Sequence, residues 1–240
     1  MAVTATLLTQ GNSTTNAASY ATASVTPTSG ALLLAFISHT ALAAPVSLAG
    51  TVNSSDAVLF PLVVGWPDGY QGATRARALE CWAGYAPAAT SGAFTFDFLG
   101  SNTQTGACWA LVECTGTGLA ASTNTAVRNI LRGVSWRNGA SASHNSRPVT
   151  MPNPRAAGNA SIFAFMHTSN EVTTPGAGLT ELADQTNADA GGFEVSWVNA
   201  AVASGTATWA TGAAGAGIGV EVAVSGNTTF TANPESVIHA

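Results

Sequence analysis

The chain has 240 residues, a mass of 24.0 kDa, a formal net charge of −5 and only 8% charged residues, against roughly 25% in ordinary globular proteins. Its seven basic residues are all arginine and form no cluster that could meet phosphates, which argues against nucleic-acid binding. No basic segment precedes an apolar one at the start, so we expect no secretory signal, and no apolar run approaches the about 20 residues of a membrane span.

The small number of charged residues also determines which side chains cover the surface of the folded protein. A folded chain of this size exposes on the order of 10,000 Å², so 7 basic and 12 acidic side chains leave most of it to small neutral residues. Such a surface loses little hydration free energy when it is buried. The composition indicates a subunit that packs against neighbours, although a small-residue bias of the genome would give the same composition.

The first part of the chain shows strand patterns separated by turn residues. Residues 3–25 alternate small, polar and apolar side chains, and the wholly apolar run 30–40 fits a strand buried on both faces. Pro61 breaks an apolar segment and favours an edge strand or a bend there. Further strands are predicted at 75–82, 93–98 and 107–114. In the second of these, every other residue is phenylalanine, so the rings would share one face.

Residues 115–148 lack a sustained strand pattern and are predicted to be an irregular linker. Within them, 127–136 could make a short helix or an irregular arm. Arginine is favoured at protein interfaces, so we expect an inter-subunit arm here and just beyond it. Its candidate residues are Arg128, Arg132, Trp136, Arg137, Arg147 and Arg155.

From residue 148 the order of elements repeats loosely. The run 158–168 resembles 30–40, and each ends in a His-Thr pair. Segment 193–198 corresponds to 79–82, 205–209 to 92–96, and 218–224 to 107–114.

These patterns predict an all-β fold with little helix. We expect a single domain, an antiparallel jelly-roll-like β-sandwich in which two pseudo-repeated four-strand halves close face to face. The first half would cover about 1–114, the irregular linker 115–148, and the second half about 149–240.

Three stretches resemble a family of tailed-bacteriophage virion proteins. They read SYATASVTPTSGALLLAFISHT, then ALECWAGYAP, GAFTFDF and TGACWALVECTG in the middle, and TTPGAGLTEL with SGTATWATGAAGAGIGVEVAV near the end. The resemblance covers most of residues 16–225, rests on strand ends and turns, and leaves 115–148 unmatched. It implies a β-sandwich in the capsid or tail and no known active site.

We find no signature for catalysis, a metal or a cofactor. There is no Gly-x-Ser-x-Gly elbow and no His or Cys spacing typical of zinc. His39 and His167 end matching buried strands and could converge only if those strands are neighbours. Hydrogen bonding at each strand end is the simpler interpretation.

The three cysteines favour buried, reduced thiols. Cys108 and Cys114 lie six residues apart in one predicted strand, roughly 20 Å at about 3.3 Å per residue, so they cannot bridge each other. Cys81 could pair with either of them if the strands are neighbours.

The function expected from these features is that of a non-enzymatic structural protein of a phage virion, assembled in the cytoplasm of the bacterial host. It would be a capsid decoration or cement subunit, or part of a tail or fibre. Its partners would be copies of itself, with a trimer as one suitable arrangement, and virion proteins such as the major capsid protein.

The alternative is a carbohydrate-binding or host-recognition module that contacts a host surface glycan. Aromatic rings can stack on sugars while carboxylates and amides bind the hydroxyls. The loop with Trp66, Asp68, Tyr70 and Gln71 carries these groups. Anchoring of the loop itself, or a subunit contact, would use the same residues.

Overall fold

The computed structural model describes residues 2–41, 49–55, 57–65, 76–101, 103–116, 127–133, 144–151, 157–200, 202 and 204–224. In this part of the chain nearly all regular structure is β-strand, with one short 3-10 turn at Leu99–Ser101. Every strand pair is antiparallel. The predicted all-β antiparallel sandwich is therefore confirmed.

The sixteen strands of the described residues divide into two sets of eight. The first set is β1 (Thr4–Ser13), β2 (Ser19–Ala21), β3 (Leu32–Ala41), β4 (Ala49–Asn53), β5 (Val58–Gly65), β6 (Ala76–Tyr85), β7 (Thr95–Phe98) and β8 (Gly106–Thr115). The second set is β9 (Val127–Gly133), β10 (His144–Thr150), β11 (Ala160–His167), β12 (Thr174–Pro175), β13 (Thr180–Asn187), β14 (Gly191–Val198), β15 (Ser204–Ala213) and β16 (Gly215–Val222).

The two sets have the same strand order. The first forms one sheet in the order β1-β8-β3-β6-β5-β4-β7-β2. The second forms a sheet in the order β13-β14-β11-β16-β9 and another in the order β10-β15-β12. Adding eight to each number of the first set gives the neighbours of the second, except that β12 and β13 are not paired. The repeating unit is therefore eight strands, and the predicted four-strand halves were too small.

The prediction of an irregular linker at 115–148 was wrong for two of its segments. Residues 127–133 form β9, which pairs with β16, and are neither helix nor irregular arm. Residues 144–150 form β10, which pairs with β15. The pattern was hard to recognise because His144–Thr150 buries only two of its side chains, Arg147 and Val149.

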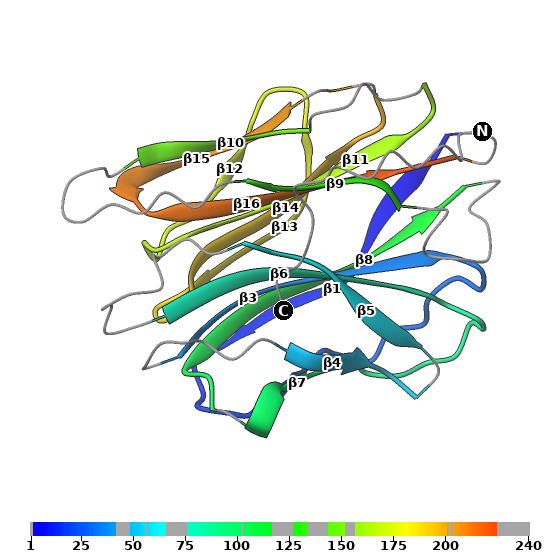
Figure 1. Ribbon diagram of the computed structural model, residues 1–240, viewed down its shortest axis with the longest axis horizontal. Coiled ribbons are helices and arrows are strands. Elements are labelled where there is room, and N and C mark those ends of the chain that lie inside the picture. The colour runs from blue at the N-terminus through cyan, green and yellow to red at the C-terminus, as the bar shows by residue number, and fades with distance from the viewer. Residues whose placement is uncertain are drawn as a thin grey trace.

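The strands stack in four layers, as Figure 1 shows from bottom to top. The outer layers are β2, β7 and β4 in the first half and β10, β15 and β12 in the second. Between them the sheet containing β3 packs on the sheet containing β11. The buried side chains of this central layer form the largest apolar cluster of the described residues, which includes Leu34, Phe36, Ile162 and Ile218. Each half also has a smaller core of its own.

The layers explain the apolar run that begins at residue 31. In β3, Leu32, Leu34 and Phe36 face the second half, while Leu33 and Ile37 face the interior of the first. All ten residues of β3 are buried. A strand covered on both faces reads as a continuous apolar run because both sets of alternating side chains are removed from water.

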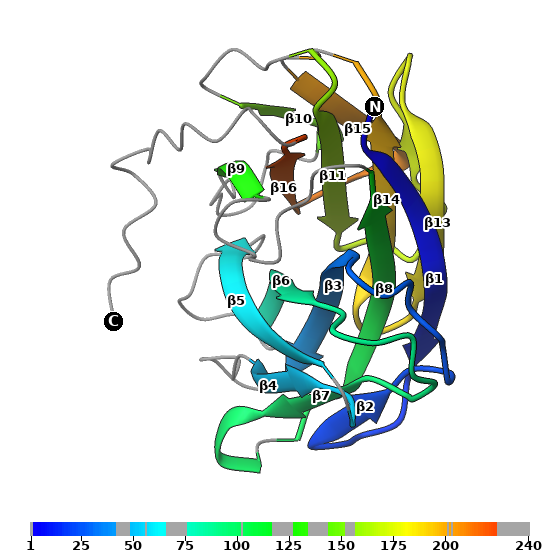
Figure 2. The ribbon, with the colours of Figure 1, turned by 90° about the vertical axis from the view of Figure 1, so that its right-hand side faces the viewer.

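The halves contact each other as two copies in a symmetric dimer would. Strand β1 lies against β13, and β5 lies against β9, as Figure 2 shows at its right and left sides. Since β9 and β13 are the counterparts of β1 and β5, the two contacts are equivalent and reciprocal. Such reciprocity is the mark of a two-fold axis, here an approximate axis within one chain.

Amide side chains link the β1–β13 side of the sandwich. Asn12 donates to Gln185 at 2.8 Å, and the Asp184 backbone donates to the Gln10 side chain at 3.1 Å. The Asn187 amide donates to the Ser13 carbonyl at 2.8 Å. These bonds satisfy groups on two adjacent strand edges that share no backbone ladder.

Candidate functional site

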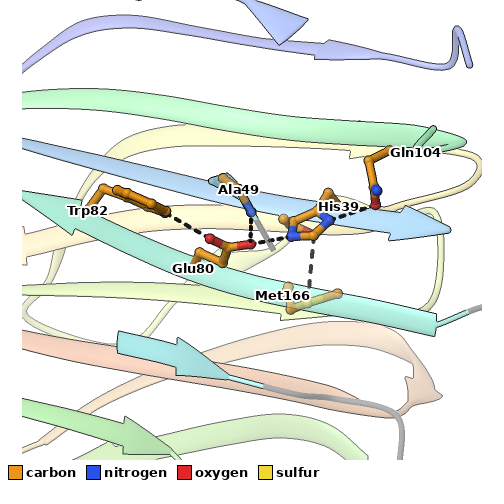
Figure 3. Close-up of polar contacts among 7 residues, drawn as sticks. His39, Ala49, Glu80, Trp82, Gln104 and Met166 are labelled. Atoms are coloured by element: carbon orange, nitrogen blue, oxygen red, sulfur yellow. Dashed lines mark hydrogen bonds and ion pairs between the residues drawn. The ribbon is translucent and has the colours of Figure 1, made fainter. Parts of the chain in front are cut away.

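A buried polar group with several hydrogen bonds is centred on Glu80 of β6 and His39 of β3. The two residues lie on neighbouring strands, and Glu80 pairs with Ile37 in the register, two residues from His39. His39 Nε2 lies 2.6 Å from Glu80 Oε1, and both side chains are buried. With the carboxylate oxygen as acceptor, Nε2 carries the hydrogen. Figure 3 shows the imidazole between Glu80 and Gln104.

Every polar atom of this pair has a partner. Glu80 Oε1 also accepts from the Ala49 backbone at 3.1 Å, and Oε2 accepts from Trp82 Nε1–H at 2.8 Å. His39 Nδ1 lies 2.9 Å from Oε1 of Gln104. The cluster therefore ties β3 and β6 to the start of β4 and to the segment before β8. Full hydrogen bonding offsets the cost of burying a carboxylate.

The second half carries the same two residue types at the same places. His39 is opposite Ala78 and Ala107 in its neighbouring strands, and His167 is opposite Gly192 and Gly215. By the same registers, Glu194 of β14 occupies the place of Glu80. A second glutamate position also repeats, because Glu113 pairs with Leu33 in the first half as Glu221 pairs with Ser161 in the second.

His167 has nevertheless turned to other partners. Its Nδ1 lies 2.7 Å from the Ser169 hydroxyl and its Nε2 lies 3.0 Å from the Thr173 hydroxyl. The ring stacks on Trp209, with centroids 4.5 Å apart. Burial lowers its pKa to about 4; Glu171 raises the pKa slightly and Arg77 lowers it further. His167 is therefore neutral near pH 7.

A glycine permits this second orientation. A Cβ atom at Gly192 would collide with the imidazole of His167. At the matching position of the first half, Ala78 has that Cβ atom. The alanine excludes the ring from this space, which leaves it beside Glu80, whereas the glycine lets the ring of His167 cover β14 and reach Thr173.

The two histidines do not converge. Each faces the interior of its own half, and the central core between β3 and β11 lies between them. Both are fully buried, so neither imidazole reaches solvent in this structure. The arrangement suits hydrogen bonding within the fold better than proton transfer to a substrate.

The structure places the predicted contact residues in three groups. The loop candidates Trp66, Asp68, Tyr70 and Gln71, together with Trp136, Arg137 and Arg155, lie outside the described residues. Arg128 and Arg132 belong to β9. Arg147 lies inside the second half and donates from Nη2 to the Gly215 carbonyl at 2.7 Å. Its side chain is thus not available to a neighbouring subunit, contrary to the expected arm.

The remaining chemistry of the described residues is sparse. Cys81, Cys108 and Cys114 are buried and unpaired, as expected, and burial raises the pKa of each thiol. No cluster of three potential metal ligands occurs within the described ranges. In that same part of the chain, no helix has the length and apolar character of a membrane span.

Sequence reasoning singled out both histidines but missed the two glutamates that distinguish their surroundings. A signal was present, because the segments 79–82 and 193–198 were matched and each contains a glutamate inside an apolar strand. A lone charged residue within a buried strand predicts a hydrogen-bonded or protonated group. Comparison with family models, curated proteins and solved structures gives no match, so function has to be inferred from the chain's own residues.

Proposed function

We propose that this chain is a non-enzymatic structural subunit of a tailed-bacteriophage virion, either a capsid decoration or cement protein or a part of a tail or fibre. The sequence resemblance supports this proposal. The strand order does too, because neighbours in the order 1-8-3-6 and 2-7-4 are those of an eight-stranded jelly roll, an architecture used in capsids. Each half of the chain is then one such unit.

The observation that carries the proposal is the outer sheet of the second half. Its outward side chains are small and neutral and lie in register across three strands, as in the row formed by Ser146, Thr208 and Thr174. The neighbouring outward positions on β10 and β15 are Pro148, Thr150 and Ser204, all exposed. Neutral side chains at these exposed positions can be buried against another protein at little desolvation cost.

Assembly would therefore proceed through this outer face, with copies of the chain or with another virion protein such as the major capsid protein. The buried polar groups would keep the sandwich rigid while the outer sheets make contacts. A role of this kind needs neither a cofactor nor an exposed catalytic group.

The experiment is to image particles and to identify their proteins by mass spectrometry after extensive washing. We expect the chain at a fixed copy number per particle. Thr208→Lys places a charge at the centre of the outer sheet and should lower incorporation at least tenfold. Thr4→Lys, on the exposed side of β1, is the control and should leave incorporation unchanged. Absence of the chain from washed particles would reject the proposal.

A further inference from the structure

The side chain of Glu194 points into the interior of the second half, on the face of β14 that it shares with Phe165 of β11. It is fully buried, and neither carboxylate oxygen has a hydrogen-bond partner among the described residues. The neighbouring Ser196 hydroxyl is buried and also lacks a hydrogen bond of normal geometry. An ionised carboxylate in such a place carries a large desolvation cost.

The groups that face Glu194 increase this cost. On β13, Asp184 pairs directly with Glu194, and Glu181 pairs with Ser196, so two acids lie on the same side of the sheet. On β16, Glu221 accepts from Asn159 at 2.7 Å. The only buried guanidinium of this interior in the described chain, that of Arg147, donates to Gly215.

The other packed elements supply no counter-charge. On β11, the imidazole of His167 is neutral and bonded to Ser169 and Thr173. Strand β12 consists of Thr174 and Pro175, and on β15 the inward side chains are Ala207 and Trp209. Strand β8 packs behind β14, in the central core, where its inward residues are apolar or cysteine.

The first half shows the hydrogen bonds that a buried glutamate can have at this place. Glu80 receives hydrogen bonds from a ring N–H, an indole N–H and a backbone N–H. Glu194 has lost all three, because Ser196 stands where Trp82 stands and His167 has turned away. The matching glutamates of the two halves therefore differ in their hydrogen bonds: Glu80 has three and the carboxylate oxygens of Glu194 have none among the described residues.

Strand β13, beside Glu194, also lacks a pairing that its counterpart β5 has in the first half. In the first half, β4 pairs with β5 through Val52–Leu59 and Asn53–Val58, which joins the inner and outer layers. Among the described residues of the second half, β12 pairs with β15 and not with β13. Across this seam the Thr173 backbone donates to Asp184 Oδ1 at 3.4 Å, a long hydrogen bond.

We propose that Glu194 is a proton-dependent latch, which holds β13 and β14 in place when protonated and releases this edge of the second half when it ionises. The latch is independent of the virion role proposed above. Burial raises the pKa of Glu194 to about 8; the Ser196 hydroxyl lowers the pKa somewhat, and Glu181 and Asp184 raise it further.

The sign of the effect follows from this shift. A carboxyl group whose pKa is higher in the folded state binds its proton more tightly there than when exposed. Its contribution to stability is complete below the ordinary pKa of about 4.5 and decreases as the pH rises towards about 8. Opening of the edge should therefore become more frequent with rising pH, by up to about tenfold per pH unit.

Hydrogen exchange tests the latch on the full chain. We expect protection factors of β13 and β14 amides, corrected for intrinsic exchange rates, to fall by roughly tenfold per unit between pH 6 and pH 8, while those of β6 change less. Glu194→Gln keeps the shape of the protonated side chain and should remove most of this dependence. Asp97→Asn, at an exposed position of β7 in the first half, is the control and should retain it.

Two outcomes would overturn the proposal. One is wild-type protection of β13 and β14 that stays constant across this pH range. The other is a Glu194→Gln protein with the same pH dependence as the wild type. Should that variant fold poorly, infrared titration of the wild type still decides the matter. A buried protonated carboxyl band must be present at pH 6 and vanish on the way to pH 9, and its absence at pH 6 would also exclude the latch.

Discussion

The two halves share a strand order and yet fill their interiors differently. In the first half, β8 contributes Trp109 and Leu111, which lie opposite Ile37 and Ala35 of β3. In the second half, β16 has glycine at both places, and the opposite residues of β11 are Phe165 and Phe163. The large side chains are therefore on β8 in the first half and on β11, the neighbour of β16, in the second. Packing depends on the filled volume between two layers, so either strand can supply the side chains.

The glycines of β16 are therefore a packing feature. A Cβ atom at Gly217 would collide with Val149 and approach Phe165, and one at Gly219 would lie 3.0 Å from Val149. These neighbours fill the volume that Trp109 and Leu111 fill in the first half. The comparison shows that one topology can be kept while the identity of the core residues changes, provided that each pair of facing strands keeps its total volume.

The largest effect is expected from removing the bulky member of such a pair. Trp109→Ala leaves a cavity beside Tyr20, whose ring lies 6.0 Å from the indole, and should lower the free energy of unfolding by about 4 kcal/mol. Phe165→Ala should cost a similar amount in the second half. Chemical denaturation measures both. A cost below about 1 kcal/mol for Phe165→Ala would show that the second interior is filled by other residues.

The next largest effect separates the two glutamates. Glu80→Ala leaves His39, Trp82 and Ala49 without their shared acceptor and should destabilise the protein by about 3 kcal/mol at pH 7. Glu194→Gln should be neutral or stabilising at the same pH. If both substitutions destabilise the protein equally, the two sites are not electrostatically different, and the contrast drawn between the halves fails.

Protonation of His167 should lower the free energy of unfolding by about 3 kcal/mol at most, because folding lowers its pKa from the ordinary 6.5 to about 4. The folded state disfavours the imidazolium, so stability is unaffected above pH 6.5 and falls as the pH drops towards 4. Nuclear magnetic resonance titration of the ring should give a midpoint near 4. A His167 midpoint above 6 would contradict the prediction.

The smallest effect concerns the residue that sets the orientation of each ring. Gly192→Ala should displace the His167 ring from β14, break its contact with Thr173 and cost about 2 kcal/mol. Ala78→Gly, in the first half, removes no contact of His39 and should cost about 1 kcal/mol through strand flexibility. Thermal unfolding compares the two variants, and a cost for Gly192→Ala below that of Ala78→Gly would speak against the role given to the glycine.

Much of the fold could be read from local patterns. The buried strands β3 and β11, the alternating Phe94, Phe96 and Phe98, and the correspondence between the two halves all follow from side-chain periodicity. Periodicity is a property of neighbouring residues, so it is present in the sequence before any long-range contact forms. The same reasoning failed for β9 and β10, which lie at the edges of their sheets. Strand β10 buries only Arg147 and Val149, so its pattern is weak.

The sequence by itself determined that this chain forms antiparallel strands, which of them would be buried on both faces, and that two histidines would end matching strands. Only the tertiary structure decided that the repeat has eight strands, that the histidines point away from each other, and that Glu80 is fully bonded while Glu194 is bare. The reason is physical: the environment of a buried polar group is set by side chains from strands distant in the sequence. A single alanine-to-glycine difference on a neighbouring strand is enough to change its partner.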